Sequence, residues 1–135
     1  MKYHKLNRYK YQTDSDEIFS SKVKDFPFEH ELFDLYSDGT FWVRKGYCWD
    51  GLSGPTWDTK SSMLPSLFHD AGYQAIRMRL LPITTKSEID LRFYKLMLES
   101  GMNKFRAKYC YQAVKTFGFS SCRVGAIYKP EVIEV

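Results

Sequence analysis

The chain has 135 residues, a length that fits one domain and leaves no room for a second independent core. Apolar residues make up 44% and charged residues 27%, which is typical of a globular chain and argues against a disordered one. Lysine and arginine number 20 and aspartate and glutamate 16. The resulting net charge of +4 is too small to indicate a nucleic-acid-binding protein, so we do not expect nucleic acid as a partner.

The termini and the cysteines predict a soluble, cytoplasmic protein. The N-terminal segment is basic, but no apolar stretch follows it as in a signal peptide. No run approaches the roughly 18 apolar residues that a membrane span needs, so we expect no membrane association. The three cysteines, Cys48, Cys110 and Cys122, are an odd number without paired metal spacing, which favours reduced thiols. The oligomeric state is left open.

The first half of the chain has the pattern of strands and tight turns. Residues 31–36 and 40–44 are rich in aromatic and branched side chains. Asp38-Gly39 between them is a strong hairpin signal, because glycine accepts the positive φ of a tight turn. Residues 5–11 alternate weakly, and residues 17–19 fit another short strand.

The second half repeats apolar residues with the period of helices. An apolar residue recurs at every fourth position over residues 63–75, which predicts a helix with Ser61 or Ser62 as its cap. Residues 85–88 resemble a capping box and start a second helix, and Gly101 is a natural stop for it.

A third helix is predicted over residues 103–117, with Gly118 at its end. We expect its four-residue apolar stripe to face inward, namely Phe105, Tyr109, Ala113 and Phe117. We expect its lysines to face solvent, namely Lys104, Lys108 and Lys115.

Strands followed by helices, without alternation, predict an α+β fold. We expect an N-terminal antiparallel β-hairpin or small sheet with three helices packed against it. The whole chain, residues 1–135, forms one domain in this prediction. Its segments are a mainly β part (1–48), a loop (49–60), a helical part (61–118) and an extended tail (119–135).

The loop between the two halves, residues 49–60, carries the side chains most suited to a functional site. Its glycines allow the backbone to approach a ligand closely, and its carboxylates, hydroxyls and indoles offer acceptors and stacking surfaces. We predict Asp50 as a catalytic residue and metal ligand. Further loop residues are predicted to contact substrate or to shape the loop: Trp49, Ser53, Trp57, Gly51 and Pro55. The alternative is a well-packed connection in which Asp50 forms a turn, Asp58 caps the helix and the tryptophans cover the core.

The helix that follows the loop contains His69-Asp70 and, four residues after the histidine, Tyr73. Because positions four apart share a helix face, His69 and Tyr73 are expected to look into one cleft. Neutral imidazole binds metals and accepts protons near neutral pH, so we predict His69 as a catalytic residue and metal ligand. Asp70 is the second catalytic candidate, and Tyr73 and Arg77 are predicted substrate contacts. Gly72 in mid-helix indicates close approach of the loop or of a ligand. The alternative is a buried histidine that is hydrogen-bonded across the loop and has no chemical role.

Asp90, near the start of the next helix, is a third acidic candidate. If the two helices turn near Pro82, Asp90 lies about seven residues, or roughly 10 Å, from the level of His69. This offset argues against direct contact with His69. We therefore expect Asp90 to pair with Arg77 or Arg79, or to support the site from behind.

Several of these motifs occur in an order that resembles one known family. They are Trp49-Asp50-Gly51-x-Ser53-x-Pro55, His69-Asp70-x-x-Tyr73, Asp90-x-x-Phe93 with Gly101, and Tyr111 to Phe117-Gly118. Together they resemble the domain-of-unknown-function 1353 family, small proteins common in bacteriophage genomes and prophages. The resemblance spans roughly residues 38–118 and implies a phage-encoded α+β protein, active in the host cytoplasm, whose loop and helix motifs line one pocket. It implies no particular reaction.

Three functions fit these observations. In the first, the protein is a hydrolase assisted by a divalent metal such as zinc, with Asp50, His69 and Asp70 as ligands or acid–base groups. In the second, a non-catalytic pocket sequesters a nucleotide-like or other small anionic ligand, in an anti-host-defence role. In the third, the basic third helix binds a virion or host protein. The first two functions predict a small-molecule substrate or ligand.

Overall fold

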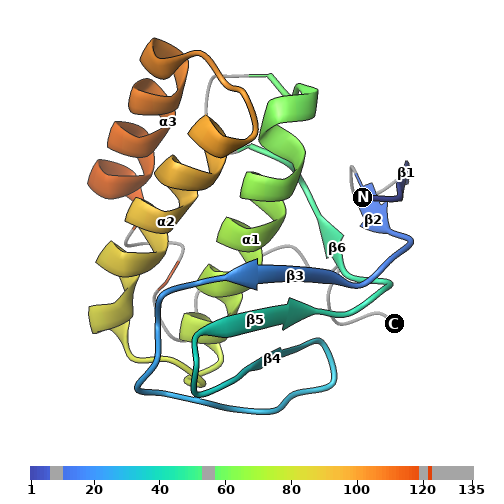
Figure 1. Ribbon diagram of the computed structural model, residues 1–135, viewed down its shortest axis with the longest axis vertical. Helices are drawn as coiled ribbons and strands as arrows, with labels where there is room; N and C mark the ends of the chain where they lie inside the picture. The colour runs from blue at the N-terminus through green and yellow to red at the C-terminus, as the bar shows by residue number, and fades with distance from the viewer. Residues whose placement is uncertain (7–10, 53–56, 119–121, 123–135) are drawn as a thin grey trace.

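The computed structural model describes residues 1–6, 11–52, 57–118 and 122, and it separates strands from helices along the chain (Figure 1). The strands are β1 (Tyr3–Lys5), β2 (Tyr11–Thr13), β3 (Glu17–Ser20), β4 (Phe33–Leu35), β5 (Thr40–Val43) and β6 (Cys48–Trp49). The helices are α1 (Lys60–Arg77), the 3-10 turn η1 (Ile83–Thr85), α2 (Lys86–Glu99) and α3 (Lys104–Phe117). The predicted α+β class is therefore confirmed.

The strands form two antiparallel three-stranded sheets, with the orders β1-β2-β6 and β3-β5-β4. The predicted hairpin is the β4–β5 pair, and Gly39 in its turn has a φ of 93°. The second sheet exists because β2 pairs with β6, which brings Tyr11 opposite Trp49. This pairing takes Trp49 out of the predicted loop and makes it part of a strand. Of the weakly alternating segment 5–11, residues 7–10 lie outside the described part of the chain.

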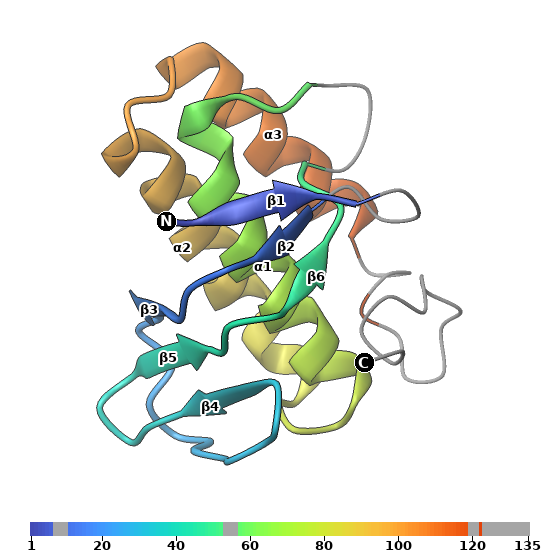
Figure 2. The ribbon, with the colours of Figure 1, turned by 90° about the vertical axis from the view of Figure 1, so that its right-hand side faces the viewer.

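Helix α1 occupies the centre of the molecule, with the sheets on one side and α2 on the other (Figures 1 and 2). Almost every residue of α1 from Ser62 to Ile76 is buried. Phe68 of α1 packs on Phe19 and Phe41 of the sheet, with ring centroids 5.4 and 5.8 Å apart. The helix begins two or three residues earlier than the serine cap predicts: Thr59 is the N-cap, and its amide donates to the Ser62 hydroxyl at 2.9 Å.

Helices α2 and α3 occur where they are predicted, but α3 buries a different face from the one expected. Its lysines are exposed as expected, whereas the predicted inward aromatic stripe is also exposed. The buried residues of α3 are Ala107 and Cys110, with Val114 partly buried beside them. These small side chains, spaced at i, i+3 and i+7, let α3 pack on α2. Both stripes have helical periodicity, so the period alone did not decide which of them is buried.

Within the described residues, no helix has both the length and the apolar character that a membrane crossing requires.

Candidate functional site

A buried polar cluster joins α1 to α2. The Asp90 carboxylate accepts three hydrogen bonds: from His69 Nε2 at 2.8 Å, from the Tyr73 hydroxyl at 2.6 Å and from Lys86 Nζ at 2.6 Å. Lys86 Nζ also donates to the backbone carbonyl of Val114 at 3.1 Å, which ties α3 to the same group. We call Asp90, His69, Tyr73 and Lys86 the Asp90 cluster; all four side chains are buried.

The direct contact between His69 and Asp90 corrects the prediction that the two residues are too far apart. Helix α1 ends at Arg77 and α2 begins at Lys86, so the antiparallel register brings Asp90 level with Tyr73. His69 is then only one helical turn, about 6 Å, from that level, a distance that its side chain spans. The predicted pairing of Asp90 with an arginine is replaced by these contacts.

Gly72 allows the two helices to approach closely. A Cβ at this position would lie 3.0 Å from Ile89 Cγ2, which is tighter than ordinary packing allows. The close neighbour at Gly72 is therefore helix α2. The prediction that the loop or a ligand approaches Gly72 is replaced by this helix contact.

The electrostatics of the Asp90 cluster determine which of its groups carry protons. Burial raises the pKa of Asp90, but the hydrogen bonds from His69, Lys86 and Tyr73 outweigh it and hold the pKa below its ordinary value. Burial lowers the pKa of His69 in spite of the carboxylate beside it, and burial together with the bond to Asp90 raises the pKa of Tyr73. Near neutral pH the imidazole is therefore neutral. Because an ionised carboxylate only accepts, Nε2 carries the ring proton and Nδ1 keeps a lone pair.

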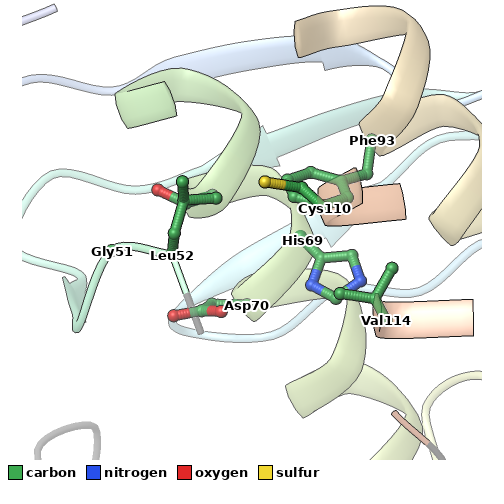
Figure 3. Close-up of a pocket in the computed structure, with 8 residues that line it drawn as sticks. Gly51, Leu52, His69, Asp70, Phe93, Cys110 and Val114 are labelled. Atoms are coloured by element: carbon green, nitrogen blue, oxygen red, sulfur yellow. The ribbon is translucent and has the colours of Figure 1, made fainter. Parts of the chain in front are cut away.

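His69 also forms part of the wall of a small pocket (Figure 3). The pocket is lined by side chains and backbone from the loop and from all three helices: Gly51, Leu52, Ser66, His69, Asp70, Phe93, Cys110 and Val114. In Figure 3 the imidazole lies near Val114, and the Asp70 carboxylate lies on the side of Gly51 and Leu52. The cavity volume is about 10 Å³, which suits one water molecule.

Asp58 holds the loop against this pocket. Its carboxylate accepts the Leu52 amide at 2.9 Å and the Tyr11 hydroxyl at 2.6 Å. Gly51 has a φ of 79°, and a Cβ there would lie 2.3 Å from Asp58 Oδ1. Gly51 therefore allows the close approach of the Asp58 carboxylate, and its predicted supporting role in a site stays a prediction. Asp58 itself closes the loop, and Thr59 caps the helix in its place.

The predicted substrate contacts of the loop divide into three groups. Trp49 is 1% exposed and its indole N–H donates to the Ser66 hydroxyl at 3.0 Å, so this ring belongs to the core. Trp57 is 68% exposed, and the Arg106 guanidinium carbon lies 5.2 Å from its ring centroid. Ser53 and Pro55 lie outside the described residues.

The remaining predicted residues lie on or near α1. Asp50 is half-buried beside Gly51 and is not among the described residues that line the pocket. Asp70 is buried and lines the pocket. Tyr73 is buried with its hydroxyl bonded to Asp90, and Arg77 is half-buried at the end of α1. The structure thus brings His69 and Asp70 to one pocket and places Tyr73 behind it.

The described residues do not support the predicted metal site at Asp50 and His69. Nowhere in this part of the chain do three or more His, Cys, Asp or Glu side chains gather closely enough to hold a metal ion. His69 Nε2 is already bonded to Asp90, which leaves only Nδ1 for any further ligand.

Comparison with family models, with curated proteins and with solved structures found no match to this chain. The resemblance of its motifs to the domain-of-unknown-function 1353 family stays a prediction, and so does its phage origin.

Sequence reasoning missed Lys86 as a partner in the site, and it missed Cys110 and Ser66 in the pocket wall. A signal for Lys86 was present: Lys86, Asp90, Phe93 and Met97 lie on one helical stripe. Two opposite charges that continue an apolar stripe predict a buried ion pair rather than a solvated helix start. No comparable signal marks Cys110, because it resembles any other residue of the α3 contact face.

Proposed function

We propose that the protein is a hydrolase in which His69 acts as a general base held in place by Asp90. The observation that carries this proposal is that one imidazole both lines the pocket and donates its Nε2 proton to a buried carboxylate. This arrangement resembles the histidine–aspartate pair of hydrolytic triads, in which the acid fixes the tautomer and stabilises the imidazolium.

The chemistry assigned to each group follows from its contacts. His69 Nδ1, with its lone pair, takes a proton from the attacking nucleophile, and Asp90 stabilises the imidazolium that results. The imidazolium returns this proton to the leaving group as the scissile bond breaks. Lys86 and Tyr73 keep Asp90 ionised and fixed during that step. Lys86 and Tyr73 only hold the Asp90 carboxylate in place, since neither residue is among the described residues that line the pocket.

Water is the nucleophile that the pocket best accommodates. Ser66 is unsuited to the role because its hydroxyl donates to the Met63 carbonyl at 3.0 Å and accepts the Trp49 indole N–H. The pocket volume fits a single water. In the proposal, that water attacks a small ester or phosphodiester that binds at the loop side, next to Asp70. The non-catalytic alternative, in which a ring stacks on Trp49, Trp57 and Tyr73, has less support because Trp49 and Tyr73 are buried and only Trp57 is exposed.

A panel of nitrophenyl esters, phosphodiesters and chromogenic peptides tests the proposal. We expect turnover of at least one class, and a 10²- to 10⁴-fold loss in His69→Gln, the size of a general-base contribution. His4→Gln is the matched control, because His4 forms a pair with Asp14 at 2.8 Å that is exposed. Equal loss in both variants, or no turnover by the wild type, contradicts the proposal.

Two measurements separate this reading from the metal-assisted one. Turnover should survive dialysis against a chelator; loss on chelation and recovery with added zinc would support the metal-assisted version instead. Independently of turnover, ¹⁵N NMR of the His69 ring should show the Nε2–H tautomer near neutral pH. A ring protonated on Nδ1 would remove the base from the pocket.

A further inference from the structure

Three aromatic rings of α3 are exposed, and two of them, Phe105 and Tyr109, lie on the face that points away from α2. Phe105 is 73% exposed, Tyr109 49% and Phe117 77%. In Figure 1, α3 lies at the edge of the molecule beyond α2, away from both sheets. Single exposed apolar residues are common on protein surfaces, but a group of large rings along one helix indicates a contact surface.

The same helix accounts for the excess positive charge of the chain. It carries Lys104, Arg106, Lys108 and Lys115, and residues 101–118 contain no aspartate or glutamate. The net charge of the whole chain is +4, so the rest of the sequence balances to zero. The net charge of the chain is small, but the whole excess of positive charge is concentrated on one helix.

The lysines and the rings are arranged side by side. At 3.6 residues per turn, Lys104, Lys108 and Lys115 fall within about 40° of one another around the helix axis; we call them the lysine row. Phe105 and Tyr109 lie about 40° apart and roughly a quarter turn from the lysine row; we call them the aromatic pair. The two groups are in reach of each other, since Lys104 Nζ is 5.5 Å from the Phe105 ring centroid.

We propose that the outer face of α3 binds single-stranded nucleic acid. The aromatic pair stacks on successive bases, and the lysine row follows the phosphates. Exposed rings beside a positively charged track are the elements by which proteins hold single strands without sequence preference. This proposal does not depend on the chemistry of His69.

Other anionic partners match the surface less well. A helix that binds a lipid bilayer needs a continuous apolar face of residues such as Trp, Phe and Leu, whereas the exposed positions of α3 offer three separate rings and no Leu, Ile, Val or Met. Duplex DNA offers the lysine row its phosphates, but its bases are already stacked and leave the aromatic pair unused. An acidic peptide likewise engages only the charges. Single strands are the class that uses both groups.

Fluorescence anisotropy with labelled oligo-dT and oligo-U of about 15 nucleotides tests the proposal on the full chain. We expect binding by the wild type. A plot of the logarithm of the affinity against the logarithm of the salt concentration should have a slope of about −2, the value for three neutralised phosphates on a single strand. Phe105→Ala and Tyr109→Ala should each lower affinity about tenfold. Both residues are exposed, so neither substitution removes core packing, and circular dichroism checks that the variants keep the fold.

A matched control comes from the β half of the chain. Lys24 and Phe26 are an exposed lysine and an exposed ring in a loop, so Lys24→Ala and Phe26→Ala should leave binding unchanged. Three results would overturn the proposal: no binding to either oligonucleotide, binding that is insensitive to Phe105→Ala and Tyr109→Ala, or binding to phosphatidylserine vesicles without binding to oligonucleotides.

Discussion

His69 Nε2 and Asp90 Oδ1 lie 2.8 Å apart, although the two residues come from different helices. The contact depends on where each helix starts and ends, and on the close approach of α1 and α2 at Gly72. It couples the proposed chemistry to the stability of the fold, because the carboxylate that holds the imidazole also holds Lys86. Changes at Asp90 should therefore affect both properties.

Replacing Asp90 with asparagine should lower the free energy of unfolding by about 3–5 kcal/mol. The shape of the side chain is kept, but the buried Lys86 ammonium loses its counter-charge, and an uncompensated buried charge is costly. Urea denaturation measures the change. Asp14→Asn, which removes the carboxylate of the exposed His4–Asp14 pair, is the matched control and should cost about 1 kcal/mol or less. Equal losses in the two variants would show that the Asp90 cluster adds little stability.

The stability of the protein should fall as the pH drops below about 6.5. Burial holds the pKa of His69 below its ordinary value of 6.5, so between that value and the lower folded-state pKa the unfolded chain binds a proton that the folded chain does not. The lowered pKa of Asp90 adds a second loss below about pH 4, when the carboxylate of the unfolded chain takes up its proton first. Urea denaturation from pH 4.5 to 8 measures the first effect, and His69→Gln should flatten the curve between pH 5 and 6.5. A wild-type curve that is flat in that range would contradict the burial of a neutral imidazole.

The sequence was sufficient for the features that depend on local pattern. Asp38-Gly39 predicted the β4–β5 turn, Gly101 predicted the end of α2, and the His69-Asp70 motif predicted two residues of the pocket wall. Each of these depends on the preferences of a few neighbouring residues, which the chain displays directly.

The features that sequence reasoning missed depend on packing between distant segments. The two-residue strand Cys48–Trp49 exists only because it pairs with β2, and a short strand of this kind has no periodicity to detect. The contact of Asp90 with His69 depends on the length of the α1–α2 connection. If α2 shifts by one turn along α1, the Asp90 carboxylate changes from out of reach of His69 to within hydrogen-bond distance. The stripe of α3 that is buried was decided by the fit of Ala107 and Cys110 against α2.

Removing the Tyr11 hydroxyl should loosen the loop at the pocket. Tyr11→Phe leaves the Asp58 carboxylate with one fewer donor, while the Leu52 amide still reaches it. We expect a loss of about 1.5–3 kcal/mol in the free energy of unfolding, the usual range for a hydrogen bond to a charged group. Hydrogen exchange should show faster exchange of the Leu52 amide in Tyr11→Phe than in the wild type. Tyr36→Phe, at an exposed ring of the β half, is the control and should leave that amide unchanged.

Gly118 and Tyr73 should show strong coupling in a double-mutant cycle. A Cβ at position 118 would lie 2.3 Å from the Tyr73 hydroxyl, so Gly118→Ala forces that hydroxyl away from Asp90. The backbone of Gly118 has a φ of −76°, which alanine adopts freely, so the cost is steric. We expect Gly118→Ala to lower the free energy of unfolding by about 1–3 kcal/mol in the wild type, the usual cost of overpacking. The loss should be smaller in Tyr73→Phe, where the contact with the hydroxyl is gone and only the contact with the Val114 carbonyl, at 2.5 Å, remains severe. Urea denaturation of the two single variants and the double variant measures the coupling, and additive losses would show that position 118 does not press on the Asp90 cluster.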